Sequence, residues 1–247
     1  MVTFTNAGRF GNWFLECCTA LSYAIKHDLE FTVPSHSDNP HWNPIYCLHL
    51  VNPNYNPHLE KIQLWETQHN YQELPFEESW RNKNICIEGY RQTEKYFVEH
   101  RDEILYLLNF PYEKKDGYVG LHLRFGDYET LREKHPLVTR EYYEKAMAMF
   151  PNYKFKVFSD EIHKAVEFLK GIEGLEFSSN TSEVDDAVEL SCCEHQICSA
   201  STFSWAAMWM NRNKNKKVIF PDFWFTPNWC NLDVSDIVPD WCIKLSV

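Results

Sequence analysis

The chain opens with a pattern that predicts strand, turn, helix and strand. Residues 1–5 alternate between apolar and polar side chains, and a turn with two glycines, Gly8 and Gly11, follows. Over residues 13–25 apolar side chains recur at helical spacing, and residues 29–33 form a short apolar run before a proline. This order is typical of the beginning of a βαβ unit.

Residues 34–90 break this regularity. Prolines, asparagines, histidines and aromatic residues crowd there with little periodicity. Such a composition predicts irregular, loop-rich structure with a few short elements, which we expect to cap a cleft. A strand is expected at residues 84–90, and apolar spacing predicts a helix at residues 96–108.

The second half of the chain is regular. The predicted strands are residues 118–123, 155–158, 175–177, 196–198 and 218–220, and the predicted helices are residues 139–149, 161–170, 186–193 and 202–211. Strands that alternate with helices favour an α/β fold with a mostly parallel, doubly wound sheet. The stretch 111–116 is charged and rich in turn residues, so we predict one domain at residues 1–113 and a second at residues 114–247.

Bulk composition excludes several classes of protein. The net charge is −11 and no Lys/Arg stripe is present, whereas nucleic-acid binding requires a basic footprint. No apolar run approaches the ~20 residues that span a bilayer, and no basic leader opens the chain, so we expect a cytoplasmic protein. The nine cysteines include no C-x-x-C pair, which indicates reduced thiols. The aromatic fraction of 16% suits either core packing or stacking on sugars and bases.

Polar residues follow three of the predicted strands, and in open α/β sheets ligands bind at that edge. At the end of the strand 118–123, His122 and Arg124 alternate, so both side chains leave on one face. An arginine fork there suits a diphosphate, because it donates two hydrogen bonds and keeps its charge. An internal ion pair between Arg124 and Asp127 is the alternative.

The other two loops carry carboxylates and hydroxyls. Asp160 and Glu161 follow a strand, where they can accept hydrogen bonds from a base or a ribose, or cap the next helix. Ser201, Thr202 and Phe203 stand where a helix begins, so backbone N–H groups there can bind an anion, with an ordinary N-cap as the alternative. Together the loops predict a pocket for a nucleotide diphosphate.

The residue types give no support for a metal site. No D-x-D sequence is present, although that carboxylate pair is usual where a metal holds a nucleotide-sugar. His36, His41 and His49 fall in the irregular region without a tight ligand spacing. We therefore expect no metal, and we assign these histidines to a loop or an acceptor cleft.

Four segments also carry the motifs of a known family. They are Gly8-Arg9-Phe10-Gly11-Asn12, similar to G-[RG]-[LF]-G-N-Q; HLRFGDY at 122–128, similar to H-x-R-R-G-D-Y; FSDE at 158–161, similar to F-S-D-D; and Asp186, Leu190 and Cys193 before STFSW at 201–205. VIFP at 218–221 and a Trp-Phe pair at 224–225 follow. In these motifs and their order, the chain resembles the α-1,2-fucosyltransferase family, and more distantly the α-1,6- and protein O-fucosyltransferases.

This resemblance implies a fold as well as an activity. It implies two Rossmann-like halves of GT-B type, with the GDP-sugar bound by the C-terminal half. The acceptor-side half is expected to be reduced, because the chain is short for the family. The implied reaction is inverting transfer of L-fucose from GDP-fucose to a hydroxyl of a glycan acceptor, in α-1,2 linkage, without a metal or another cofactor.

The resemblance also implies roles for the donor-side residues. Arg124 would hold the β-phosphate, and His122 and Asp160 would face guanine. Ser201, Thr202 and the backbone of Phe203 would complete the phosphate site. Glu161 would bind the donor from the same loop as Asp160. Glu161 stands where the family has aspartate, and Phe125 replaces the second arginine, as in the protein O-fucosyltransferases.

On the acceptor side, the implied lining residues are Gly8, Arg9, Gly11, Asn12, Trp13 and Glu16. Asn12 would orient the acceptor hydroxyl, while Trp13 replaces a glutamine of the family and so bears on acceptor specificity. The base that takes the acceptor proton is one of Glu16, Asp127 and Glu129, and we group Arg124, Asn12 and Asp127 as catalytic. Two alternatives stay open: a transferase that uses another nucleotide-sugar, and a non-catalytic glycan- or nucleotide-binding protein.

Overall fold

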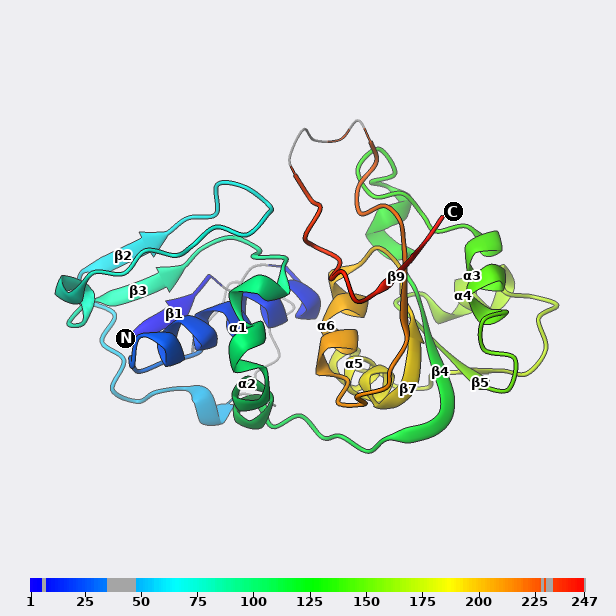
Figure 1. The fold of residues 1–247 in the computed structure, drawn as a ribbon, viewed down its shortest axis with the longest axis horizontal. Helices are drawn as coiled ribbons and strands as arrows, with labels where there is room; N and C mark the ends of the chain where they lie inside the picture. The colour runs from blue at the N-terminus through cyan, green and yellow to red at the C-terminus, as the bar shows by residue number, and fades with distance from the viewer. Residues whose placement is uncertain (6–7, 35–47, 228, 230–232, 247) are drawn as a thin grey trace. The chain divides into compact units, whose positions relative to one another are not determined.

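The computed structural model describes residues 1–5, 8–34, 48–227, 229 and 233–246. The chain forms two units (Figure 1). The N-terminal unit comprises Met1–Phe110 and Leu232–Ile237, and the C-terminal unit comprises Pro111–Asn231 and Val238–Val247. Each unit is built on a parallel sheet of its own, which confirms the predicted α/β class.

The N-terminal unit has a three-stranded sheet in the order β1-β3-β2. Its strands are β1 (Val2–Phe4), β2 (Lys61–Leu64) and β3 (Asn84–Ile87), and its α-helices are α1 (Phe10–Lys26) and α2 (Arg101–Leu108). Apolar residues of β1 and β3 are buried, as are most residues of α1, which packs against both strands. Burial of this apolar face stabilises the unit.

Several predicted elements of this unit differ from the structure. The expected strand 29–33 is reduced to one bridge between Phe31 and Val2. The expected helix 96–108 begins only at Arg101, because Phe97 adopts a non-helical backbone between two short 3-10 helices. The region expected to be irregular contributes β2 and β3 to the sheet, while its residues 35–47 lie outside the described residues.

The C-terminal unit has a six-stranded parallel sheet in the order β6-β5-β4-β7-β8-β9. Its strands are β4 (Lys115–Leu123), β5 (Lys154–Ser159), β6 (Leu175–Phe177), β7 (Cys193–Ile197), β8 (Val218–Pro221) and β9 (Ile243–Leu245). Its α-helices are α3 (Arg140–Met147), α4 (Ile162–Phe168), α5 (Glu183–Cys192) and α6 (Thr202–Met210). The alternating pattern predicted the first five of these strands and all four helices, but not β9.

Helices cover both faces of this sheet. On one face, Leu121 and Val157 pack with Tyr142 of α3 and Ala165 of α4. On the other face, Phe158 packs with residues of α5 and α6. Since β5 and β6 lie on one side of β4 and β7 on the other, the chain reverses direction across the sheet between β4 and β7. At such a point, the loops that follow the two neighbouring strands run in opposite directions, and a crevice forms between them.

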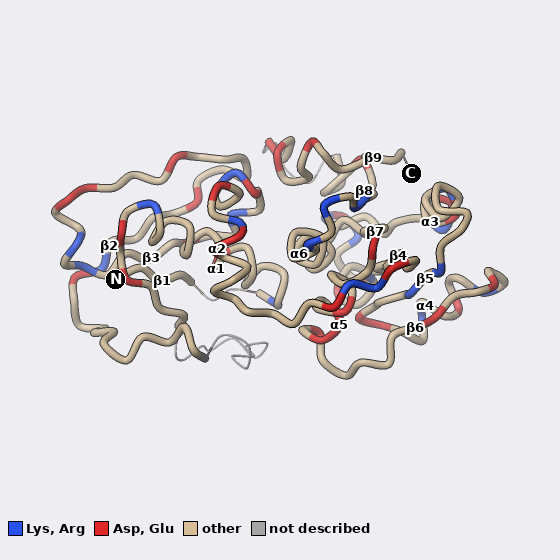
Figure 2. Tube along the Cα trace, turned by 60° about the horizontal axis from the view of Figure 1, so that its bottom comes forward, with Lys and Arg blue, Asp and Glu red and all other residues tan. Residues whose placement is uncertain are grey.

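Three further features of the described residues are the distribution of charge, the burial of the cysteines and the character of the helices. Lys and Arg are interspersed with Asp and Glu along both units (Figure 2). The seven described cysteines are all buried, among them Cys86 in the N-terminal unit and Cys193 and Cys198 in the C-terminal unit. Among the helices within the described ranges, none has both the length and the apolar character needed to traverse a bilayer.

Candidate functional site

Three loops with predicted site residues leave three adjacent strands of the C-terminal sheet. Arg124 directly follows β4, Asp160 directly follows β5, and the segment Ser199–Ser201 lies between β7 and α6. Because β5, β4 and β7 are neighbours and parallel, these loops meet at the carboxyl edge of the sheet. The position coincides with the change in strand order, where open α/β sheets bind their ligands.

Arg124 is held between two carboxylates. Its Nη2 lies 2.5 Å from Asp127 Oδ1 and its Nη1 lies 2.9 Å from Asp160 Oδ2. Asp160 is 9% exposed and also accepts a hydrogen bond from the Phe125 N–H at 3.0 Å, whereas Asp127 is 54% exposed. The internal ion pair that the sequence left as an alternative is therefore present, and the buried Asp160 extends it.

The turn after Arg124 is shaped by Gly126. Its φ is +32°, and a Cβ at this position would lie 2.4 Å from Asp160 Oδ2. Only a residue without a side chain lets the backbone pass this close to the carboxylate. Gly126 thus allows Asp160 to reach both Arg124 and the backbone of the loop.

Tyr128 joins the loop after β4 to the loop before α6. Its hydroxyl donates to the Ala200 carbonyl at 3.1 Å, and the Arg124 guanidinium lies 5.2 Å from the centre of its ring. The other side of this region is covered by His135, whose ring stacks on Tyr128 at 4.2 Å. Burial raises the pKa of Tyr128 to about 12 and lowers the pKa of His135 to about 4. The sequence motif contained Tyr128, but its link to Ala200 was not predicted.

His122 lies beneath these loops rather than on their surface. It is 2% exposed, and its Nδ1 is 2.9 Å from Ser199 Oγ and 2.6 Å from Ser204 Oγ. Its ring packs at 4.7 Å against Phe203. The two serines were not singled out from the sequence, although their spacing across the start of α6 brings both hydroxyls to one atom. They fix the orientation of the imidazole.

The start of α6 and the start of α4 are capped differently. Ser201 is the N-cap of α6, and its hydroxyl accepts from the Phe203 N–H at 3.3 Å. The ordinary N-cap expected as an alternative is therefore present, with Thr202 as the first helical residue. At α4, Glu161 is exposed and makes no side-chain cap, so the carboxylates of this loop are not explained by helix capping.

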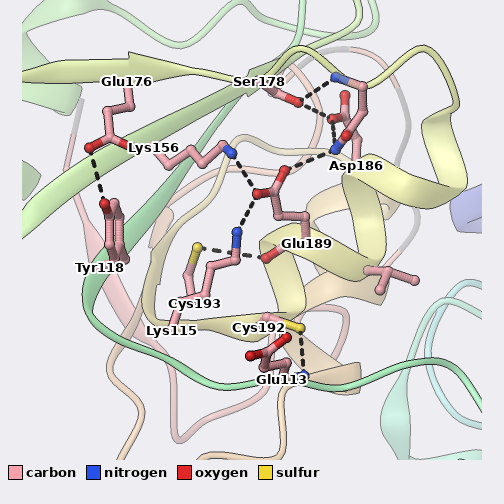
Figure 3. A network of polar contacts seen from close by, with 12 residues as sticks. Glu113, Lys115, Tyr118, Lys156, Glu176, Ser178, Asp186, Glu189, Cys192 and Cys193 are labelled. Atoms are coloured by element: carbon pink, nitrogen blue, oxygen red, sulfur yellow. Dashed lines mark hydrogen bonds and ion pairs between the residues drawn. The ribbon is translucent and has the colours of Figure 1, made fainter.

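Asp186 belongs to a polar network at α5 (Figure 3). Its carboxylate accepts from Ser178 Oγ at 2.5 Å and from Asn180 Nδ2 at 3.1 Å, and burial raises its pKa. Glu189 of the same helix accepts from Lys115 of β4 and Lys156 of β5. Burial alone would raise the pKa of Glu189, but these hydrogen bonds lower it. The network fixes α5 and the loop after β6 to the sheet.

In the N-terminal unit, the glycine turn leads into α1. Gly8 has a φ of +74°, and a Cβ there would lie 2.6 Å from Asn12 Nδ2. Asn12 Oδ1 accepts from Gln92 Nε2 at 3.3 Å, which ties the turn to the loop after β3. Arg9 is the N-cap residue of α1, and Gly11 lies in its first turn and is buried.

Trp13 and Glu16, which the sequence assigned to the acceptor side, are both buried. Trp13 is 6% exposed and packs on Phe4 and Phe10, and Glu16 is 0% exposed. Both side chains belong to the buried face of α1. The third candidate base, Glu129, forms an ion pair with Lys164.

The described residues contain no cluster of three or more His, Cys, Asp or Glu side chains that could hold a metal ion. His36 and His41 lie outside the described residues. His49 is exposed, and its Nε2 contacts the Leu107 carbonyl at 2.7 Å.

Comparison with known proteins gives one family. Residues 67–241 match the family model of glycosyl transferase family 11. The O-antigen biosynthesis glycosyltransferase WbnK of Escherichia coli is 29% identical over an alignment of 170 residues, and the match covers 58% of this chain. The match spans 56% of WbnK, little more than half its length.

Among solved structures, POFUT1 in complex with GDP-fucose has a TM-score of 0.50 at 12% identity, over 89% of this chain and 96% of that one. POFUT1 in complex with GDP has a TM-score of 0.50 at 11% identity, over 89% and 97%. These similarities concern the fold.

Proposed function

The chain belongs to glycosyl transferase family 11, and from this premise we propose that it transfers L-fucose from GDP-fucose to a hydroxyl of a glycan acceptor. The reaction inverts the anomeric carbon, forms an α-1,2 linkage and requires no metal or other cofactor. The fold is of GT-B type, with the donor bound by the C-terminal unit and the acceptor by the N-terminal unit. The GDP-fucose and GDP complexes of the similarly folded POFUT1 support the choice of donor.

The observation that carries this proposal is the position of Arg124. Its guanidinium lies at the edge where the loops after β4, β5 and β7 meet, over the ring of Tyr128, whose hydroxyl donates to the Ala200 carbonyl just before the N-cap of α6. A diphosphate is the ligand that suits a fixed guanidinium beside a helix N-terminus. Asp127, which is exposed, now occupies one side of the guanidinium, whereas the buried Asp160 holds the other. The donor phosphate therefore displaces Asp127 and leaves Asp160 in place.

In the reaction, the acceptor oxygen attacks C1 of fucose while the bond from C1 to the β-phosphate oxygen breaks. The electron pair of that bond remains on the phosphate, where Arg124 stabilises the developing charge. The proton of the acceptor hydroxyl passes to a base. Of the three candidates, Asp127 is exposed and is released when phosphate binds Arg124, whereas Glu129 is paired and Glu16 is buried. Asn12 orients the acceptor.

The test is thermal stabilisation of the purified chain by GDP, UDP and ADP, with and without EDTA. A ligand that binds the folded state raises the melting temperature by mass action. We expect GDP to stabilise the wild type most and EDTA to change nothing. Arg124→Ala and Arg124→Lys should both lose most of the shift, and the lysine variant keeps a cation beside Asp160. Arg132→Ala, an exposed arginine in the same unit, is the matched control.

The outcomes distinguish the proposed fucosyltransferase from the two alternatives. A larger shift with UDP contradicts GDP as the nucleotide, and no shift with any nucleotide contradicts the transferase itself. If GDP stabilises the chain but the chain neither transfers fucose nor hydrolyses GDP-fucose, the protein is the non-catalytic alternative.

A further inference from the structure

Two aromatic side chains are exposed at neighbouring strand ends of the N-terminal sheet. Trp65 directly follows β2 and is 62% exposed, and Tyr90 follows β3 by three residues and is 40% exposed. The strands are parallel, with Leu64 opposite Ile87, so both residues belong to the carboxyl edge of the sheet. The two exposed rings offer large, rigid surfaces that a ligand can stack on.

The loops that carry the two rings are fastened to each other. The Glu66 carboxylate accepts from the backbone N–H groups of Tyr90 and Arg91, each at 2.9 Å. Gly89 has a φ of +95°, and a Cβ there would lie 2.3 Å from the Glu66 Cβ. Only glycine allows this approach of the loops. Trp65 and Tyr90 therefore stand on one joined framework.

Arg91 fixes this framework from inside. It is 1% exposed, and its guanidinium donates to the carbonyls of Leu64 at 2.6 Å and Glu88 at 3.1 Å, at the ends of β2 and β3. It also donates to the Tyr96 hydroxyl at 3.2 Å. Its φ of +48° is unusual for a residue with a side chain. Such backbone strain persists where the surroundings enforce it, and it concentrates at binding sites.

A pocket of 320 Å³ lies beside Trp65. Its lining includes Gln63, Gln72 and Arg91. The Gln72 amide oxygen accepts from Thr67 Oγ1 at 2.9 Å, which orients that amide. The volume is at the lower end of small-molecule sites, which are on the order of 300–1,000 Å³. An aromatic face beside oriented amides suits a sugar ring, which has C–H groups on one face and hydroxyls around its rim.

The framework also reaches the glycine turn. Gln92, two residues after Tyr90, donates to Asn12 Oδ1 at 3.3 Å. In the proposed function, Asn12 orients the acceptor hydroxyl. The exposed rings, the pocket and Asn12 are thus connected along one edge of the N-terminal sheet.

We propose that Trp65 and Tyr90 form a platform that binds a pyranoside ring of the acceptor glycan. The assignment of this pyranoside to the acceptor rests on the proposed function. The binding of a pyranoside by this unit does not depend on it. Trp65 supplies the main stacking surface, Tyr90 extends it, and the amides at the pocket hydrogen-bond the sugar hydroxyls.

The test measures binding of methyl β-D-galactopyranoside, methyl β-D-glucopyranoside and methyl α-D-mannopyranoside to the full chain by saturation-transfer NMR and titration. We expect at least one of them to bind saturably. Trp65→Ala should weaken that binding about tenfold, which corresponds to about 1.4 kcal/mol, and Tyr90→Ala by a smaller factor, because the Tyr90 ring is the less exposed of the two. Tyr106→Ala is the matched control, since Tyr106 lies on α2 in the same unit and is 80% exposed. Its binding should equal that of the wild type.

Two results overturn the platform: saturable binding that survives both Trp65→Ala and Tyr90→Ala, or no saturable binding of any of the three sugars. Melting temperatures of the variants, with and without GDP, check that the fold and the donor site remain. If GDP fails to stabilise the wild type while sugar binding still depends on Trp65, the proposed function fails and the platform stands.

Discussion

Replacing Arg124 by alanine should destabilise the chain through Asp160 and hardly at all through Asp127. Both carboxylates contact the guanidinium, at 2.9 Å and 2.5 Å, but Asp160 is 9% exposed and Asp127 is 54% exposed. An exposed ion pair contributes about 0–1 kcal/mol. A buried carboxylate that loses its cation costs about 3–5 kcal/mol.

We therefore expect Arg124→Ala to lower the free energy of unfolding by about 3 kcal/mol or more. Adding Asp160→Asn to that variant should recover most of the loss, because it removes the buried charge and keeps an oxygen that accepts from the Phe125 N–H. Asp127→Asn alone should change stability by less than about 1 kcal/mol. Urea unfolding followed by circular dichroism measures all three variants, with Arg132→Ala as the control.

Two results would refute this reasoning. One is a loss in Asp127→Asn as large as that in Arg124→Ala. The other is a double variant no more stable than Arg124→Ala. Either would mean that the stabilisation does not reside in the buried carboxylate.

Three further predictions concern the same loops. Tyr128→Phe removes the hydroxyl bond to the loop before α6, and should weaken GDP binding by about 1 kcal/mol in calorimetry while leaving the ring stack intact; unchanged affinity would contradict the link. Gly126→Ala should lower the melting temperature more than Gly117→Ala. Both glycines have a positive φ, but only at Gly126 would the added Cβ lie 2.4 Å from Asp160. Equal effects of the two substitutions would refute a steric cause. Burial lowers the pKa of His135 to about 4, so its contribution to stability is complete above about pH 6.5 and is lost as pH falls towards 4. His135→Phe should flatten the fall in melting temperature over that interval, and an unchanged slope would show that this histidine does not cause it.

The periodic part of the chain could be predicted from the sequence because its elements are long or strongly apolar. Helices α3 and α6 and strands β5 and β8 lie within one to two residues of their predicted ends. By contrast, β9 has only three residues, and its pairing with β8 depends on a segment that returns late in the chain. β6 is equally short but was predicted because it continues the alternation of strands and helices, whereas no helix among the described residues lies between β8 and β9.

The positions of the donor-side loops could likewise be predicted from the sequence, but the contacts between their side chains could not. Arg124 and Asp160 were both singled out, yet their ion pair joins residues on adjacent strand ends, which local spacing does not reveal. In the N-terminal unit, Trp65 was missed because β2 lies in a region whose prolines and asparagines hide a short alternating run, KIQL. The alternation followed by Trp-Glu is the signal that could have identified it.

The buried cysteines give each unit its own reporter of opening. Only a thiolate reacts readily with alkylating reagents, and burial raises the pKa of Cys86 and of Cys193 to about 12. Alkylation therefore waits for the surrounding structure to open, and its rate follows that local equilibrium. Cys86 reports on the N-terminal sheet and Cys193 on the C-terminal one. Mapping alkylated peptides in the presence of GDP or of a sugar would show which unit each ligand makes slower to open.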